Sequence, residues 1–144
     1  GYLLHRGIQT LPLRVEAAQG NASFIAGQLC NHPAVSKVYH PSLSHCDPTG
    51  LMGRQMKGPG ALCAFELKGG QAHAAKVMKK VKLCTPAVSL GSVDTLIQHP
   101  AGLTHRNASP KSRQLAGITE GLLRMSIGIE DAQDLWQDLK QALS

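Results

Sequence analysis

Hydrophobic residues recur with helical spacing in three parts of the chain. The spacing predicts a helix over 11–31, with Pro12 in its first turn, another over 71–82, and a closing helix after Asp131. The apolar stripes, in chain order, are Val15, Ala18, Ala22, Ile25, Ala26 and Leu29, then Ala74, Val77, Met78 and Val81, then Ala132, Leu135, Trp136, Leu139, Ala142 and Leu143. Gly20-Asn21 weakens the first helix by about 1 kcal/mol. We therefore expect a neighbouring surface to hold it there, or a local bend.

Other segments alternate apolar and polar residues, as half-buried strands do. The predicted strands cover residues 35–40, 61–67, 83–90, 94–98 and 123–129. Ser109-Pro110 supplies an N-cap followed by a proline at the first helical position, so a short helix is predicted over 111–116. One more helix is predicted over 51–57. These elements predict an α/β (α+β) sandwich, a mainly antiparallel sheet with helices on one face.

The last predicted strand carries an arginine on its polar side. Its apolar side consists of Leu123, Met125, Ile127 and Ile129, which alternate with Arg124, Ser126 and Gly128. Arg124 is therefore predicted to point away from the core. A guanidinium on a rigid strand can grip a carboxylate through two parallel hydrogen bonds, which a lysine does not supply. From this pattern alone, an ordinary surface arginine remains the alternative.

Composition and charge narrow the possible partners. Hydrophobic residues make up 42% and charged residues 17% of the 144 residues, as in a globular domain rather than a disordered chain. The net charge of +6 could attract nucleic acid, but aromatic residues are only 3% and no nucleic-acid-binding motif is present. We read the lysines of 76–82 as a solvated helix face. No apolar run is long enough to span a bilayer, and we predict a cytoplasmic protein without nucleic-acid or membrane partners.

The cysteines and histidines raise the question of a metal. His40, His45, Cys46 and Asp47 lie close together in the sequence, but their spacing matches no zinc pattern, so no metal site is predicted. The four cysteines include no C-x-x-C pair. We expect buried thiols rather than disulfides, with Cys46 as the exception.

Several segments resemble one enzyme family in the same order along the chain. They are Leu3–Leu11 (LLHRGIQTL), Pro59-Gly60-Ala61, Phe65–Gly70, Ala87–Ser92 (AVSLGS), Leu96–His105 (LIQHPAGLTH) and Gly117–Asp131 (GITEGLLRMSIGIED). This order resembles the C-terminal domain of the pyridoxal-phosphate enzymes of cysteine and methionine metabolism. Among these, the chain most resembles the methionine gamma-lyases, with the cystathionine gamma-lyases close behind.

The resemblance implies a fold and a set of site residues. The fold is the small C-terminal domain of the aspartate-aminotransferase-like (fold type I) enzymes, with residues 1–10 connecting it to a large cofactor-binding domain and residues 11–144 forming the small domain. Arg124 matches the arginine that binds the substrate α-carboxylate. Ser89 and the backbone of Leu90 match the segment beside that carboxylate. His99 and Thr104 match positions near the substrate pocket.

The resemblance also implies an activity. The longer protein is expected to be a carbon–sulfur lyase that uses pyridoxal 5'-phosphate, acts on methionine, cystathionine or a related amino acid by α,γ-elimination, and forms a homotetramer. The lysine of the internal Schiff base has no match here, so no catalytic residue is assigned and the chain alone is expected to be inactive. Cystathionine gamma-lyase, cystathionine gamma-synthase and homoserine sulfhydrylase remain alternatives. So does a non-catalytic binding or assembly module.

Overall fold

The computed structural model describes the backbone of residues 1–144 and every side chain except that of Pro110. The elements in chain order are α1 (Tyr2–Ile8), α2 (Leu11–Cys30), β1 (Val35–Tyr39), the single-turn helix η1 (Ser44–Cys46), β2 (Leu62–Leu67), α3 (Gly70–Lys80), β3 (Thr85–Pro86), β4 (Leu96–Gln98), α4 (Pro110–Leu115), β5 (Leu122–Ser126) and α5 (Ala132–Leu143). None of the described helices is long and apolar enough to cross a membrane.

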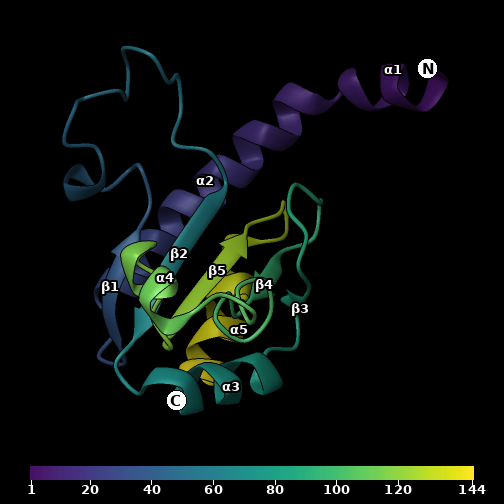
Figure 1. Ribbon diagram of the computed structural model, residues 1–144. Helices are drawn as coiled ribbons and strands as arrows, with labels where there is room; N and C mark the ends of the chain where they lie inside the picture. The colour runs from purple at the N-terminus through teal and green to yellow at the C-terminus, as the bar shows by residue number, and fades with distance from the viewer.

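The strands form one sheet in the order β1-β2-β5-β4-β3. Every neighbouring pair is antiparallel except β3 and β4, which run parallel. Helices α2, α3 and α5 contribute buried residues to the same core as β2 and β5, and Figure 1 shows α2 and α5 behind the sheet, with α1 extending away from it. The predicted mainly antiparallel sheet with helices on one face is confirmed. The opposite face of β5 carries the polar side chains of that strand.

The core explains why the three helical stripes fold where they do. Ile25 of α2, Val77 of α3 and Leu139 of α5 are fully buried against Phe65 and Leu123 of the sheet. The weak Gly20-Asn21 position is held by a neighbouring surface, as expected. The Asn21 side-chain amide donates to the carbonyls of Gly128 and Glu130 at 3.1 and 2.7 Å. These two bonds fasten the middle of α2 to the segment that follows β5.

Two predicted elements differ from the structure. Residues 51–57 form turns rather than a helix, because Gly50 and Gly53 adopt φ values of +64° and +78° and glycine populates this left-handed region without steric cost. The strand predicted over 83–90 shrinks to β3. The Asp138 carboxylate accepts the backbone N–H groups of 82–84, which removes them from any strand ladder.

Burial also corrects two expectations about side chains. Ile129 is 42% exposed although it continues the apolar alternation, because β5 ends before it at Ser126. Cys30, expected to be buried, is exposed at the end of α2. Cys63 and Cys84 are buried as expected, and burial raises the pKa of the Cys63 thiol to about 12, which keeps it protonated and unreactive.

Candidate functional site

Arg124 lies in the middle of the sheet, on the face opposite α2 and α5. Strand β5 runs between β2 and β4, and Arg124 pairs with Ala64 on one side and Gln98 on the other. Its neighbours Leu123 and Met125 are fully buried on the helical side. Paired residues of adjacent strands point to the same face, so a small residue and an amide flank the guanidinium. The predicted outward direction of Arg124 is confirmed.

Neutral oxygen atoms hold the guanidinium. The Nη2 of Arg124 donates to the backbone carbonyl of Ser89 at 2.8 Å. With its amide oxygen turned toward the arginine, Gln98 accepts from Nη1 and Nε at 3.1 and 3.2 Å. Among the described side chains the single ion pair joins Arg113 and Glu120, at 2.9 Å. The positive charge of Arg124 is therefore positioned without an acidic partner.

The bend that contacts Arg124 is itself fastened to β5. The Oγ of Ser126, two residues after Arg124 on the same face, accepts the backbone N–H of Gly91 at 2.9 Å. Gly91 has a φ of +80°, a conformation that favours glycine at this turn. Arg124 and Ser126 thus hold the two ends of the segment 89–91, which carries Ser89 and Leu90.

The rest of this loop is anchored to the segment after β5. The N–H of Ile129 donates to the carbonyl of Val93 at 2.9 Å. The buried hydroxyl of Thr95 accepts the Gly128 N–H at 2.9 Å and donates to the Glu130 carboxylate at 2.9 Å. These bonds fix the distance between the two segments, so the position of Ser89 relative to Arg124 does not depend on their mutual contact alone.

The five site residues predicted from the sequence do not all lie together in the structure. Arg124 and Ser89 are in direct contact, and Leu90 lies next to Ser89 with 56% of its surface exposed. His99 is buried, and its Nε2 bonds the Glu120 carbonyl at 2.8 Å. Thr104 is exposed, and its hydroxyl bonds the ring of the adjacent His105. The bonds described for His99 and Thr104 do not lead to Arg124, and their place at a site stays a prediction.

Sequence reasoning missed Gln98 and Ser126. Both are 2% exposed, and both contact the Arg124 site. Ser126 carried a usable signal, because it shares the face of Arg124 by alternation. Gln98 carried a weaker one, as a polar residue that ends an otherwise apolar run. Its position opposite Arg124 depends on the strand register, which the sequence pattern does not supply.

A cavity of about 330 Å³ lies beside the bend. Its wall combines the start of α2 with the loop after β3 and the end of β5, and the residues that contribute are Leu11, Arg14, Val15, Ala18, Gly60, Ala61, Gly91, Ser92, Val93, Ser126, Ile127 and Ile129. Most of this wall is apolar, with Arg14 as its cation. Ser126 and Gly91, which are hydrogen-bonded to each other, belong to this wall.

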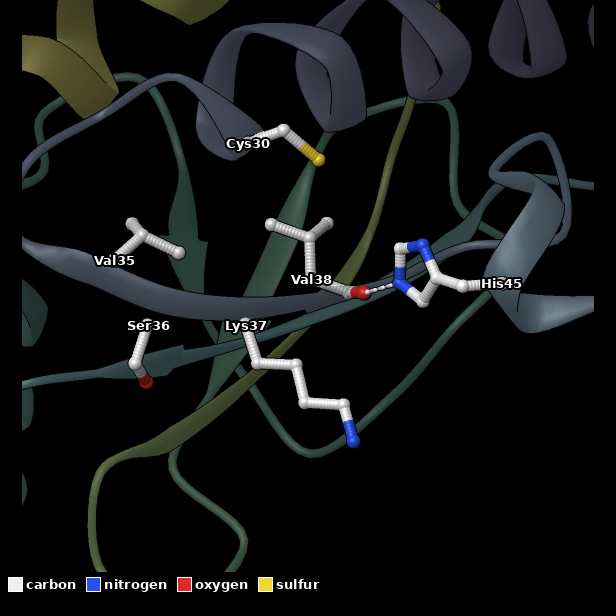
Figure 2. A pocket seen from close by; sticks show the side chains of 6 residues that line it. All are labelled: Cys30, Val35, Ser36, Lys37, Val38 and His45. Carbon is white, nitrogen blue, oxygen red and sulfur yellow. Dashed lines mark hydrogen bonds between the residues drawn. The ribbon is translucent and has the colours of Figure 1, made fainter.

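A second cavity, of about 230 Å³, opens at the edge strand β1. Figure 2 shows His45 reaching across it to the Val38 carbonyl, and its Nε2 lies 3.0 Å from that oxygen. The other residues weighed as metal ligands also have structural partners. His40 Nε2 lies 3.2 Å from the Gly60 carbonyl, the Cys46 thiol donates to the Val38 carbonyl at 3.7 Å, and the Asp47 carboxylate accepts the N–H groups of Leu51 and Met52. Among the described residues, no group of three or more His, Cys, Asp or Glu side chains could hold a metal ion.

The Ser126 contact gives a local prediction. Ser126→Ala removes the acceptor for the Gly91 N–H, so the amide hydrogen of Gly91 should exchange about tenfold faster, as the loss of one hydrogen bond implies. Hydrogen exchange followed by NMR measures this directly. Ser92→Ala is the control, because the exposed Ser92 hydroxyl donates to Asp94 and not to the bend. Unchanged exchange at Gly91 in Ser126→Ala would show that the bend holds without this bond.

Comparison with known proteins identifies the family. The model of the Cys/Met metabolism PLP-dependent enzymes, where PLP is pyridoxal phosphate, matches residues 1–144. An L-methionine gamma-lyase of Brevibacterium sandarakinum is 48% identical over 142 residues, and one of Porphyromonas gingivalis is 46% identical over the same length. The matches cover 99% of this chain but 35% and 36% of those proteins, so the chain spans about a third of their length.

Solved structures agree with this assignment. A cystathionine gamma-lyase from Micromonospora echinospora superposes with a TM-score of 0.93 at 39% identity, covering 99% of this chain and 37% of that one. A cystathionine gamma-synthase from Xanthomonas oryzae pv. oryzae, in complex with aminoacrylate and cysteine, gives 0.89 at 45% identity, covering 96% and 36%. The implied fold type I architecture and the resemblance noted in the sequence are thereby confirmed. The chain belongs to the pyridoxal-phosphate-dependent enzymes of cysteine and methionine metabolism.

Proposed function

We propose that this chain is the substrate-carboxylate-binding domain of a methionine gamma-lyase-like enzyme that performs α,γ-elimination. The observation that carries the proposal is the Arg124 guanidinium. It lies on the sheet face opposite α2 and α5, its hydrogen-bond partners are the uncharged oxygens of Ser89 and Gln98, and Ser126 of the same strand lines a mostly apolar cavity. A sulfur amino acid has a matching shape, with a carboxylate at one end and a thioether chain at the other.

The role of Arg124 in this reaction is to bind and orient. A charge-assisted pair between a guanidinium and a carboxylate is stronger than a neutral hydrogen bond and fixes the plane of the bound group. With the carboxylate fixed, the Cα–H bond is held in one direction, and orientation of this kind removes part of the entropic barrier to reaction. The bend at Ser89 and Leu90 borders the same position, and its backbone is held by Arg124 and Ser126.

The residues described around Arg124 supply a guanidinium for a carboxylate but no lysine amine for the cofactor. An enzyme of this family needs a lysine amine to hold pyridoxal phosphate, which acts as the electron sink when bound. The residues described around the cavity beside Gly91 include no lysine, and elsewhere Lys37 lies over the Tyr39 ring while Lys80 bonds the Ser144 carbonyl. We assign the cofactor to a larger domain outside this chain, with residues 1–10 as the connection and 11–144 as the small domain.

The substrate and assembly belong to the same proposal. Methionine is preferred over cystathionine because the sequence relatives cited above are named methionine gamma-lyases. A cystathionine gamma-lyase or gamma-synthase reaction is the alternative, since solved structures with those names superpose with TM-scores of 0.93 and 0.89. The whole protein is proposed to be a cytoplasmic homotetramer.

The test uses the longer protein that contains this chain. With L-methionine and pyridoxal phosphate, it should release methanethiol, ammonia and 2-oxobutanoate in equal amounts, while the isolated chain releases none. Cystathionine is assayed in parallel, and formation of cystathionine from added cysteine and an O-acylhomoserine, with release of the carboxylic acid, would assign a synthase instead. A longer protein that binds the cofactor but transforms neither amino acid would overturn the proposal in favour of a non-catalytic module. Turnover by the isolated chain would disprove the assignment of the cofactor to another domain.

A further inference from the structure

Gln98 is placed to control the orientation of Arg124. It ends β4, is 2% exposed, and pairs directly with Arg124 across the β4–β5 ladder. Its amide oxygen, turned toward the guanidinium, accepts from Nη1 at 3.1 Å and from Nε at 3.2 Å. On the other side of Arg124, the paired residue is Ala64, which has no polar group. Gln98 is therefore the side chain that fixes the arginine laterally.

An arginine without such a partner would not be fixed. The side chain has about 2 kcal/mol of rotamer entropy to lose when it is held in one geometry. The Ser89 carbonyl restrains Nη2 alone and belongs to an exposed loop. The Gln98 oxygen is buried in the sheet, where neighbouring strands hold its backbone. A buried acceptor of this kind pre-organises the guanidinium before any ligand arrives.

The neutrality of the amide also matters. A carboxylate at the same place would hold the arginine equally well but would compensate its charge and compete with a bound anion. An amide accepts the same hydrogen bonds and leaves the charge available. The described residues give Arg124 no acidic partner, since the ion pair found among them is that of Arg113 with Glu120.

We propose that Gln98 is a positioning residue, whose buried amide oxygen sets the plane of the Arg124 guanidinium so that its free N–H groups face the substrate carboxylate. The inference rests on the proposed function, because it assigns Gln98 a part in the same binding step. Gln98 does not touch the substrate. Its effect passes through Arg124, and so it should depend on the carboxylate of the substrate and on the presence of Arg124.

The main variant is Gln98→Met in the longer protein, since methionine keeps the length and lacks the amide oxygen. The KM for L-methionine should rise about tenfold, as the loss of one charge-assisted bond implies, while kcat and the visible absorbance of the bound cofactor change little. Activity toward L-methioninamide, which lacks the carboxylate, should be the same in both proteins. Gln137→Met is the matched control, because Gln137 is exposed on α5.

Three further variants exclude a merely structural effect. Gln98→Glu keeps an acceptor oxygen but compensates the charge of Arg124, so it should hold the arginine without restoring the wild-type KM. Combined with Arg124→Lys, Gln98→Met should add little, because residues that act through one another give non-additive losses. If Gln98→Met lowers the thermal midpoint of unfolding, Gln98→Asn is used in its place. The shorter asparagine amide no longer reaches Arg124, so this variant should show the same rise in KM.

The outcomes separate this inference from the proposed function. If the longer protein degrades methionine and Arg124→Lys raises KM, but both Gln98→Met and Gln98→Asn keep the wild-type KM, the positioning role is overturned and the function stands. An equal loss with methionine and methioninamide also overturns it. If Arg124→Lys itself leaves KM and kcat unchanged, the carboxylate site fails, and the role of Gln98 fails with it.

Discussion

Arg124→Lys in the longer protein is expected to lower kcat/KM for L-methionine by about 30- to 150-fold, which corresponds to about 2–3 kcal/mol of lost interaction. The lysine keeps the charge but loses the planar fork that binds two carboxylate oxygens together. It also cannot reach the Ser89 carbonyl and the Gln98 amide in the same geometry, so the bend loses a support. Steady-state kinetics measures the effect.

Cofactor spectra and a matched variant complete this experiment. The visible absorbance of bound pyridoxal phosphate should stay close to that of the wild type, because the cofactor contacts are proposed to lie outside this chain. Arg106→Lys makes the same chemical change at an exposed position and should leave the kinetics unaltered. Wild-type kinetics in Arg124→Lys would remove this residue from the site. Loss of the cofactor spectrum would place it at the cofactor instead of the substrate carboxylate.

Asp138→Asn is expected to lower the free energy of unfolding of the chain by about 3 kcal/mol at neutral pH, the largest loss of stability foreseen for one polar substitution. Asp138 is 7% exposed on α5, and its carboxylate accepts the backbone N–H groups of 82–84 at 2.8, 2.8 and 3.0 Å. These bonds connect α5 to the segment between α3 and β3. Asparagine offers one oxygen in place of two, and its NH₂ group faces donors.

The same residue predicts a pH dependence. Burial by itself raises the pKa of the Asp138 carboxyl, but the N–H donors of 82–84 and the Gln141 amide outweigh it and hold this pKa below its ordinary value. The folded state then binds protons less readily than the unfolded state. The stabilisation is complete above the unfolded pKa of about 3.9 and is lost as the pH falls through the lower folded pKa.

Urea denaturation at several pH values measures both effects. The difference in unfolding free energy between wild type and Asp138→Asn should be constant above about pH 5 and should shrink below about pH 4. Asp134→Asn, at an exposed position in the first turn of the same helix, should stay within about 1 kcal/mol of the wild type. A difference of the same size in both variants, or one that grows in acid, would contradict the role given to Asp138.

Local patterns in the sequence were sufficient for much of the fold. The apolar stripes placed α2, α3 and α5, and the predicted cap at Ser109 is formed, since its side chain accepts the Ser112 N–H at 3.1 Å. Alternation placed β2 and β5 and the outward direction of Arg124. These features depend on residues a few positions apart, and a side chain's face is fixed by the period of its own element.

The two wrongly predicted elements share one cause. A polar group, either distant or near in the sequence, binds backbone groups that a strand or helix would otherwise have used. The segment 83–90 has strand-like composition, yet Asp138 captures its first N–H groups and β5 captures its end through Arg124 and Ser126. The turn at 51–57 is fixed by glycines and by the Asp47 carboxylate, which accepts the N–H groups of Leu51 and Met52. The secondary-structure propensity of a short stretch of sequence does not include such contacts.

By itself, the sequence determined most of the residues that face the core, where the main helices and the strands β2 and β5 lie, and that Arg124 stands on a polar face with the family motifs around it. Only the tertiary structure decided that Gln98 flanks Arg124 and that Ser126 supports Gly91. The reason is physical. The periodicity of the sequence shows on which face of its own helix or strand each residue lies. Strand register and loop anchoring depend instead on contacts between segments far apart in the chain, and these contacts form together only when the core is packed.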